Sequence, residues 1–443
     1  MSNMIKLNYK DTIHLDEKDI LDVSSTLYEY IGTLSKISRN VGYEDLESFL
    51  QLPNDKELIE KSQSMAAGLA GTSLKYVIVV GIGGSNLGAM AVYDALYSKF
   101  DILTSRRPKL IFSDTTNPRE MEALKKVIDE NIHGSKEIVL NIITKSGTTA
   151  ETVANGMFLF DILSNKFGEK EAIERTVITT DEESTLWNIA REKNIRVLPI
   201  PKKVGGRYSI FSPVGLFPLR LVGVNISEFI AGAVQMMNAS LTPNIDANPA
   251  LKLATIDFLQ HKKKLTIYNN FFFNSELESV GKWGRQLVAE SLGKRFDTAG
   301  NSIYAGLTPI VSIGSTDLHS MVQLYLGGPR DKFTNFIYAE SGEGERVSVP
   351  KFSIFQTLVP DVVGKDYEKI LSSILVGTME AYKEKAFPYI ETILPRIDEN
   401  SLGQYFMLKM IETVLLGKLW NVNAFDQPEV ESYKKVAREL MKS

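Results

Sequence analysis

Five short runs of apolar, mostly β-branched residues alternate with segments of helical periodicity across the first half of the chain. The runs are KYVIVVG (75–81), KLIFSD (109–114), EIVLNIIT (137–144), RTVITT (175–180) and IRVLPI (195–200). Strands that alternate with helices form parallel βαβ units with right-handed crossovers. The pattern therefore predicts an α/β domain built on a parallel sheet.

A second alternation follows at lower contrast. Its strand candidates are KKLTIYNN (263–270), TPIVSIG (308–314) and NFIYAE (335–340). The segment ASLTPNIDANP (239–249), which is rich in Asn and Pro, separates the two patterns and favours a domain boundary there. We therefore expect two α/β domains of the same plan.

The regions near the two ends of the chain have helical patterns. Apolar residues recur at helical spacing from about Glu17 to Ile37, and Asn54 with Glu57 has the spacing of a helix start. Three amphipathic patterns lie near the other end, at about 366–385, 401–419 and 428–442. We therefore expect four parts: an N-terminal helical arm (1–68), a first domain (69–240), a second domain (241–425) and a C-terminal helix (426–443).

Composition argues against several kinds of site. The chain has no cysteine and four histidines, so we expect no disulfide and no thiolate or histidine-rich metal centre, although a mononuclear carboxylate site stays open. The formal net charge of −4 lacks the basic field of nucleic-acid-binding proteins. No apolar run approaches the roughly 20 residues that span a bilayer. We expect a soluble, cytoplasmic protein that binds neither nucleic acid nor membranes.

The first strand runs into a glycine turn in VVGIGGSNLGAM (79–90). The turn begins like the dinucleotide fingerprint G-x-G-x-x-G at Gly81 and Gly83, but its sixth position is Asn86 instead of the glycine that close packing requires. Asp114 ends the second strand about 31 residues after Gly83, whereas ribose-binding acids lie about 20 residues on. A nicotinamide dehydrogenase therefore remains a weaker alternative.

A second polar turn, TKSGTTAET (144–152), follows the third strand. Hydroxyls, a glycine and the start of a helix in one turn suit a phosphate, because backbone N–H groups and the positive helix end attract anions. Thr148 with Glu151 also fits an ordinary capping box. Together with GIGGS (81–85), this turn predicts a phosphate site beyond the carboxyl ends of the strands.

Two clusters carry groups suited to acid–base chemistry. Arg207 follows two glycines in KVGGRYSIFSPVG (203–215), where a guanidinium can stabilise an oxyanion, although most arginines lie on the surface. In WGRQLVAESLGK (283–294), Gln286 and Glu290 are four residues apart and so share one helical face near the helix end. Glu290 is a candidate general base.

Two further clusters lie later in the chain. His319, in GSTDLHSM (314–321), is expected in the first turn of a helix, where an imidazole can exchange protons with a hydroxyl. Gln427 and Lys434 are seven residues apart in FDQPEVESYKK, and the pattern predicts that they share a helical face. Taken alone, a histidine of this kind is more often an ordinary core or surface residue, and a lysine on a helix face is by default solvent-exposed.

Six segments occur in the order and rough spacing of one family: GIGGS, TKSGTT, VGGRYS, AESLGK, TDLHS and FDQPEVESYKK. From about residue 70 to its C-terminus, the sequence resembles the glucose-6-phosphate isomerase (phosphoglucose isomerase) family in its shorter bacterial form. VGGRYS and FDQPEVE are the most specific segments. The sequence departs from the family pattern at Glu429, where the family usually has glycine.

The resemblance implies two sugar-isomerase-type (SIS) domains, each a mainly parallel sheet flanked by helices, in a homodimer whose active site lies between domains and subunits. It implies reversible conversion of glucose 6-phosphate to fructose 6-phosphate, through ring opening and a cis-enediolate, in glycolysis and gluconeogenesis. No cofactor or metal is implied. A non-catalytic sugar-phosphate-binding protein of the same fold is the alternative.

The resemblance also implies roles for individual residues. Glu290 matches the base that moves a proton between C2 and C1, and Arg207 matches the residue that stabilises the anion. His319 and Lys434 match the residues that open and close the ring, and the family's histidine comes from the neighbouring subunit. The residues implied to bind substrate are Gly84, Ser85, Thr144, Lys145, Ser146, Gly147, Thr148, Thr149, Gln286 and Gln427.

Overall fold

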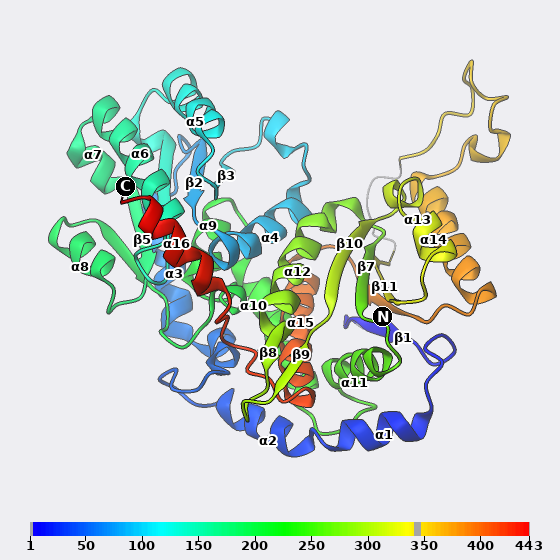
Figure 1. The fold of residues 1–443 in the computed structure, drawn as a ribbon. Coiled ribbons are helices and arrows are strands. Elements are labelled where there is room, and N and C mark those ends of the chain that lie inside the picture. The colour runs from blue at the N-terminus through cyan, green and yellow to red at the C-terminus, as the bar shows by residue number, and fades with distance from the viewer. Residues whose placement is uncertain (1–2, 341–346, 443) are drawn as a thin grey trace.

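The computed structural model describes residues 3–340 and 347–442, and in them two five-stranded sheets lie on either side of a set of central helices (Figure 1). The outermost residues of the predicted N-terminal arm and C-terminal helix, 1–2 and 443, lie outside the described residues. The first sheet is entirely parallel, in the order β3-β2-β4-β5-β6. Its strands are β2 (Tyr76–Val80), β3 (Lys109–Ser113), β4 (Ile138–Ile143), β5 (Thr176–Thr180) and β6 (Arg196–Pro199). All five lie within the predicted runs, so this part of the prediction is confirmed.

The inner strand β2 of this sheet is buried on both faces. Val77 and Val79 pack into the main core, whereas Ile78 and Val80 pack into a separate cluster on the opposite face. Successive side chains of a strand point to opposite faces, so a continuous apolar run is what a strand covered on both sides requires. The covering helices of this region are α4 (Leu87–Tyr97), α5 (Pro118–Asn131), α6 (Ala150–Phe167), α7 (Glu169–Glu174) and α8 (Thr185–Glu192).

The second sheet has the order β1-β12-β11-β7-β10. Four of its strands are parallel: β7 (Ile267–Phe272), β10 (Thr308–Ile313), β11 (Lys332–Ala339) and β12 (Tyr389–Leu394). The strand β12 is not among the predicted strands. Neither is β1 (Lys6–Asn8), which joins the edge of the sheet antiparallel to β12. The sequence predicts an all-helical N-terminal arm, and β1 shows that this prediction is wrong for residues 6–8.

The helical part of the arm is divided into α1 (Glu17–Ser25) and α2 (Tyr28–Ile37) instead of one helix over the same range. Three consecutive hydroxyls, those of Ser24, Ser25 and Thr26, donate to the carbonyls three residues back. Such bonds compete with the helical hydrogen bonds and end the helix. The next helix, α3 (Lys56–Leu69), is capped by Asp55, whose Oδ1 accepts from the backbone N of Leu58 at 2.9 Å, so Asn54 is not the cap.

The centre of the molecule is occupied by α10 (Ile226–Ser240), α12 (Glu278–Leu292) and α15 (Glu399–Leu419) (Figure 1). Every residue of α15 from Ser401 to Gly417 is buried, as expected of a helix surrounded by other elements. A Cβ on Gly403 would lie 2.0 Å from the carbonyl oxygen of Phe229, so glycine allows α15 and α10 to cross closely. The division into domains at residues 240 and 241 remains a prediction.

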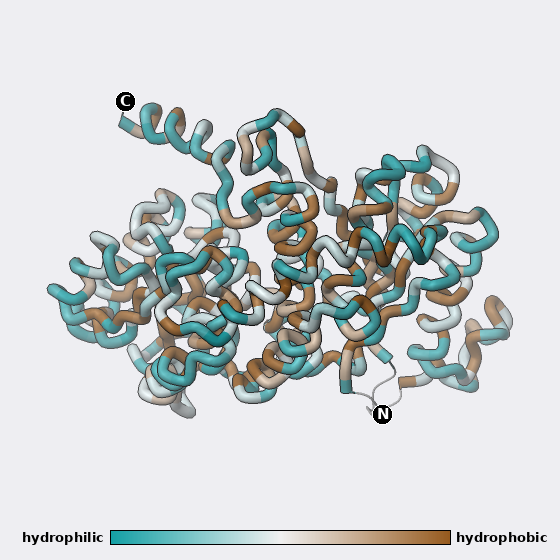
Figure 2. Tube along the Cα trace, turned by 90° about the horizontal axis from the view of Figure 1, so that it is seen from below, coloured by the Kyte–Doolittle hydropathy of each residue, from teal (hydrophilic) through white to brown (hydrophobic). Residues whose placement is uncertain are grey.

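The remaining helices surround these elements. They are α9 (Pro213–Leu221), α11 (Pro249–Lys262), α13 (Val322–Gly327), α14 (Tyr367–Glu384) and α16 (Val430–Leu440), and a short hairpin joins β8 (Lys294–Phe296) to β9 (Ser302–Ala305). The predicted patterns at 366–385, 401–419 and 428–442 correspond to α14, α15 and α16. Figure 2 shows the C-terminal helix standing away from the rest of the molecule, and none of its residues is buried.

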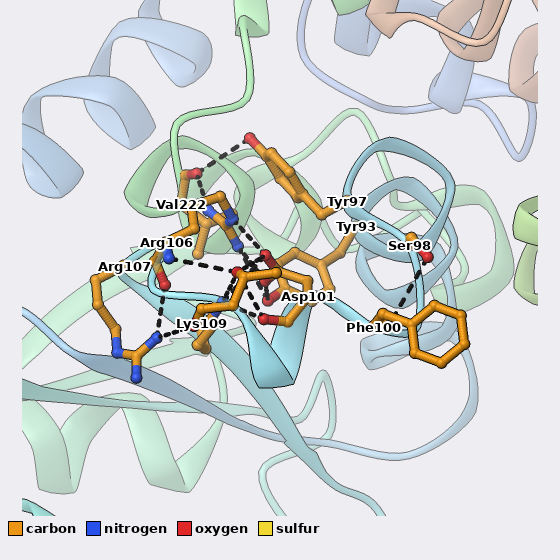
Figure 3. Close-up of polar contacts among 10 residues, drawn as sticks. Tyr93, Tyr97, Ser98, Phe100, Asp101, Arg106, Arg107, Lys109 and Val222 are labelled. Atoms are coloured by element: carbon orange, nitrogen blue, oxygen red, sulfur yellow. Dashed lines mark hydrogen bonds and ion pairs between the residues drawn. The ribbon is translucent and has the colours of Figure 1, made fainter. Parts of the chain in front are cut away.

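A polar cluster holds the connection between α4 and β3 (Figure 3). The Asp101 carboxylate accepts from Arg106 Nη2 and from the Tyr93 hydroxyl, both at 2.6 Å, and Oδ1 lies 3.1 Å from Nζ of the fully buried Lys109. The Arg106 guanidinium lies 3.8 Å from the ring centroid of Tyr97. The hydrogen bond from Arg106 is the main cause that lowers the pKa of Asp101. This network fixes α4, the helix that follows the glycine turn.

Candidate functional site

Two polar turns meet at the carboxyl edge of the first sheet. The 3-10 turn Gly83–Ser85 follows β2, and the segment 144–149 follows β4, which is hydrogen-bonded to β2. Gly83 and Gly147 have φ angles of 59° and 72°, in the left-handed region that favours glycine. The sequence prediction that these turns lie together is confirmed.

The hydroxyls of the second turn are not used to cap α6. Thr149 is the N-cap residue, so Glu151 is the second helical residue, whereas a capping box requires a glutamate at the third. The Thr149 Oγ1 lies 3.0 Å from Thr144 Oγ1, and Ser146 Oγ accepts from the Thr148 backbone N and hydroxyl. The capping-box interpretation is therefore wrong, and the hydroxyls gather around the turn.

The glycine turn after β2 contacts the turn that carries Arg207. A Cβ placed on Gly84 would lie 2.1 Å from the backbone carbon of Gly206, closer than real Cβ contacts come. Glycine at position 84 is thus required for the two turns to touch. This contact brings the Arg207 segment to the edge where the phosphate site is predicted.

Arg207 is buried, with only 3% of its side chain exposed, so the interpretation as a surface arginine is wrong. Its Nε donates to Ser291 Oγ at 2.7 Å, and Nη1 donates to Glu290 Oε2 at 3.1 Å and to Gln427 Oε1 at 3.0 Å. Nη2 donates to the carbonyl oxygen of Ala424 at 2.7 Å. One guanidinium therefore joins the end of α12 to the loop that precedes the C-terminal helix.

Both oxygens of the Glu290 carboxylate are held by side chains. Oε2 accepts from Arg207, and Oε1 accepts from Gln286 Nε2 at 3.1 Å, across one turn of α12. The Gln286 Oε1 is buried and has no hydrogen-bond partner. A Cβ on Gly83 would lie 2.8 Å from Gln286 Nε2, so this glutamine lies beside the glycine turn. The predicted shared face of Gln286 and Glu290 is confirmed.

His319 is not brought to this cluster by its own chain. It is exposed and follows the 3-10 turn Thr316–Leu318, three residues before α13 begins. The prediction that it lies in the first turn of a helix is therefore wrong. Among the described residues, no hydrogen bond or ion pair joins its side chain to Arg207 or Glu290.

Lys434 also lies apart from the cluster. Its Nζ donates to Glu431 Oε1 at 3.0 Å within α16. Gln427 lies three residues before that helix begins at Val430, so Gln427 and Lys434 do not share a helical face, and that prediction is wrong. Glu429 has a φ of −69°, which any residue adopts, so the turn does not require the glycine usual at this position.

Ser291, the neighbour of Glu290, was not singled out from the sequence. Its buried hydroxyl accepts from Arg207 and lies 2.9 Å from the hydroxyl of Tyr208, whose pKa is raised by burial. Burial also lowers the pKa of Lys145 beside the hydroxyl-rich turn. The one sequence signal that could have identified Ser291 is its position next to the candidate base Glu290.

Within residues 3–340 and 347–442, no group of three or more His, Asp or Glu side chains is placed to hold a metal ion. No helix in this part of the chain has the length and apolar character needed to cross a membrane.

The chain is similar to known proteins over almost its full length. A family model for phosphoglucose isomerase matches residues 45–443. A glucose-6-phosphate isomerase of Carboxydothermus hydrogenoformans is 34% identical over 372 residues, which cover 83% of this chain and 79% of that protein. A glucose-6-phosphate isomerase of Methanocaldococcus jannaschii is 28% identical over 442 residues, which cover 99% of this chain and 100% of that protein.

Two solved structures share the architecture. A hypothetical protein of Thermus thermophilus superposes with a TM-score of 0.85 at 26% identity, covering 99% of this chain and 100% of that one. A glucose-6-phosphate isomerase of Chlamydia trachomatis gives a TM-score of 0.82 at 18% identity, covering 100% of this chain and 89% of that one. The predicted fold class, two mainly parallel sheets flanked by helices, is confirmed.

Proposed function

Because the chain belongs to the phosphoglucose isomerase family, we propose that Glu290 carries a proton between C2 and C1 of an open-chain hexose 6-phosphate. The chain is an aldose–ketose isomerase that interconverts glucose 6-phosphate and fructose 6-phosphate, a reaction of glycolysis and gluconeogenesis. The observation that carries the assignment of the base is the position of its carboxylate, between the Arg207 guanidinium and the Gln286 amide.

The reaction moves a carbonyl by one carbon without net oxidation, so one carboxylate is sufficient to transfer the proton. Glu290 removes the proton from C2 of the aldose, the electron pair forms a C1–C2 double bond, and O1 becomes an oxyanion. The protonated Glu290 then returns the proton to C1, and the proton on O2 is transferred to O1, so that O2 becomes the ketose carbonyl and O1 a hydroxyl. Such proton transfer contributes about 10²–10⁴-fold to the rate.

Arg207 stabilises the enediolate that forms between these two steps. The guanidinium is buried and is already held by Ser291 and Ala424, so its charge needs no reorganisation when the anion appears. Gln286 and Gln427 contact the two charged groups and provide amides along the substrate chain.

The phosphate of the substrate is proposed to bind at the carboxyl edge of the first sheet, remote from the reacting carbons. There it anchors and orients the chain, so that binding energy supports the proton transfer. The residues proposed to hold it are Gly84, Ser85, Thr144, Lys145, Ser146, Gly147, Thr148 and Thr149. Their support is the convergence of the two turns and of their hydroxyls at one edge.

We also propose that the active enzyme is a cytoplasmic homodimer in which His319 of each chain enters the site of the other and, with Lys434, opens and closes the sugar ring. His319 is exposed and lies apart from its own chain's cluster. The segment before α14 has large apolar side chains at the surface, with Phe352 88% and Ile354 89% exposed, which favours contact with a second protein surface. The lack of cysteine fits a reducing compartment.

The deciding experiment is an isomerase assay of the purified chain in EDTA, with glucose 6-phosphate and fructose 6-phosphate as separate substrates. We expect turnover in both directions. A ligand-dependent thermal shift without product would indicate a non-catalytic binding protein. Activity that is lost in chelator and restored by a divalent cation would indicate a metal-assisted isomerase, and an absorbance change with NAD(P) and no coupling enzyme would indicate a dehydrogenase.

A further inference from the structure

Lys294 is a buried lysine beside the site that the mechanism above does not use. It is the first residue of β8, two residues after the end of α12 and four after Glu290, and its side chain is only 5% exposed. Burial, and then the charge of Arg207, lowers the pKa of Lys294. An ammonium group is costly to bury unless its donors are satisfied, so this position requires an explanation.

Each of the three donors of the ammonium group has an oxygen within reach. The Nζ donates to the carbonyl oxygen of Glu290 at 2.6 Å and to that of Asp426 at 2.8 Å, and it lies 3.5 Å from Asp426 Oδ1. A lysine has three donors and no acceptor, so none remains for the sugar. Lys294 therefore acts on other groups of the protein and not on the substrate.

These carbonyls belong to the two segments that carry the proposed reacting groups. The carbonyl of Glu290 is in the last turn of α12, where carbonyls lack helical partners and attract cations. The carbonyl of Asp426 precedes Gln427, and Arg207 Nη2 donates to it as well, at 3.2 Å. Lys294 thus ties the end of α12 to the loop before α16, next to the guanidinium.

From this geometry we propose that Lys294 is a positioning residue, which fixes the Glu290 carboxylate and the Gln427 amide relative to Arg207. The inference rests on the proposed function, because it assigns to Lys294 the alignment of that proton transfer. Without the ammonium group, α12 and the C-terminal loop lose their shared donor. Among the described residues, no hydrogen bond or ion pair joins the Lys294 side chain to the turns after β2 and β4, so the loss falls on proton transfer more than on substrate binding.

The test compares Lys294→Met, which keeps the length but removes the donors, with the wild-type chain in the isomerase assay. We expect kcat to fall about 10- to 100-fold and KM for glucose 6-phosphate to change less than about 3-fold. With deuterium at C2 of the substrate, the kinetic isotope effect on kcat should increase, because proton transfer has become slower. Lys294→Arg, which keeps the charge and donors, should recover most of kcat.

Lys332 offers a matched control. It is also buried and lies at the start of β11, and the polar partners of its side chain are the carbonyl of Pro329 at 3.1 Å and the carboxylate of Asp331, neither of them a proposed site residue. Lys332→Met should leave kcat per folded enzyme and the isotope effect unchanged. If Lys294→Met does not fold, Lys294→Gln takes its place, because glutamine keeps an N–H donor without the charge. Proton transfer should be slower in Lys294→Gln as well.

The inference is overturned if Lys294→Met and Lys294→Gln keep the wild-type kcat, or if their kcat falls only in proportion to the folded fraction, with an unchanged isotope effect. A wild-type chain without isomerase activity is a different result, because it refutes the proposed function before any variant is compared.

Discussion

Arg207 and Glu290 are 83 residues apart in the sequence, yet Nη1 of the arginine lies 3.1 Å from Oε2 of the glutamate. The arginine side chain is 3% exposed and the glutamate side chain 34% exposed, so a buried cation supports a carboxylate that solvent and ligands can reach. The remaining N–H groups of Arg207 are held by Ser291, Gln427 and two backbone carbonyls. The cation is therefore fixed in place before an anion forms beside it.

Replacing the proposed base should separate binding from catalysis. Glu290→Gln keeps the shape of the side chain but cannot accept the C2 proton, so we expect kcat to fall by about 10²–10⁴-fold or more. The phosphate turns are untouched, so a hexitol 6-phosphate that cannot react should bind with nearly the wild-type Kd. Coupled assays and calorimetry measure the two quantities, and a variant with near wild-type turnover would dismiss the assignment.

Arg207→Lys should not behave as a conservative change, because an ammonium group cannot reproduce a fork that reaches Ser291, Glu290 and the carbonyl of Ala424 together. We expect kcat to fall about 10²–10³-fold, as when a preorganised anion-stabilising donor is removed. The melting temperature should fall as well, because buried acceptors lose their donor. Retention of most of kcat would show that charge alone, without this geometry, is sufficient.

Gly84→Ala tests the contact between the two glycine turns. The new Cβ would meet Gly206 backbone at 2.1 Å, so one turn must shift, at a cost of about 1–3 kcal/mol in the free energy of unfolding. The KM for glucose 6-phosphate should rise with the shift of the phosphate turn. Gly284→Ala is the control, because a Cβ there meets nothing within 4 Å in the middle of α12. Equal melting temperatures and KM values for the two variants would argue against the contact.

The sequence predicts those strands that are continuous apolar runs. The strands β2, β4 and β5 are buried on both faces, so each carries its own local signal. β12 has Glu391 and Thr392 in its middle, and Glu391 is partnered by the hydroxyl of Tyr338 only in the folded chain. β1 has three residues, and its pairing partner lies in β12, near the other end of the chain. Neither strand could be recognised from neighbouring residues alone.

The sequence predicts those parts of the site that depend on the type of side chain. It does not predict the contacts that are made by backbone carbonyls. Glycines in turns, a glutamate near a helix end and an arginine after two glycines are visible in the sequence. The acceptors that orient Arg207 and Lys294 are backbone carbonyls of Ala424 and Asp426, which any residue type provides. The shared face predicted for Gln427 and Lys434 failed because the helix begins only at Val430, after Pro428.

Two buried carboxyl groups, those of Asp257 on α11 and Glu412 on α15, lie side by side. Asp257 on α11 is 2% exposed, and both its oxygens lack a hydrogen-bond partner, as does Oε2 of the neighbouring Glu412. Lys409 pairs with Glu412. Burial first, and then the charge of Glu412, raises the pKa of Asp257 well above its ordinary value. A proton on Asp257 thus supplies the donor that the pair lacks.

A carboxyl group whose pKa is higher in the folded chain than in the unfolded chain contributes to the free energy of unfolding. This contribution is fully present below the pKa of the unfolded chain, near 3.8, and is lost as the pH rises through the pKa of the folded chain. Asp257→Asn is permanently neutral, so its melting temperature should fall less than that of the wild type as the pH rises from the unfolded value, near 3.8, through the folded value. Asp161→Asn, on the exposed face of α6, makes the same charge change without burial and should follow the wild-type curve. If the melting temperature depends on pH in the same way in all three proteins, the pKa of Asp257 is not raised in the folded chain.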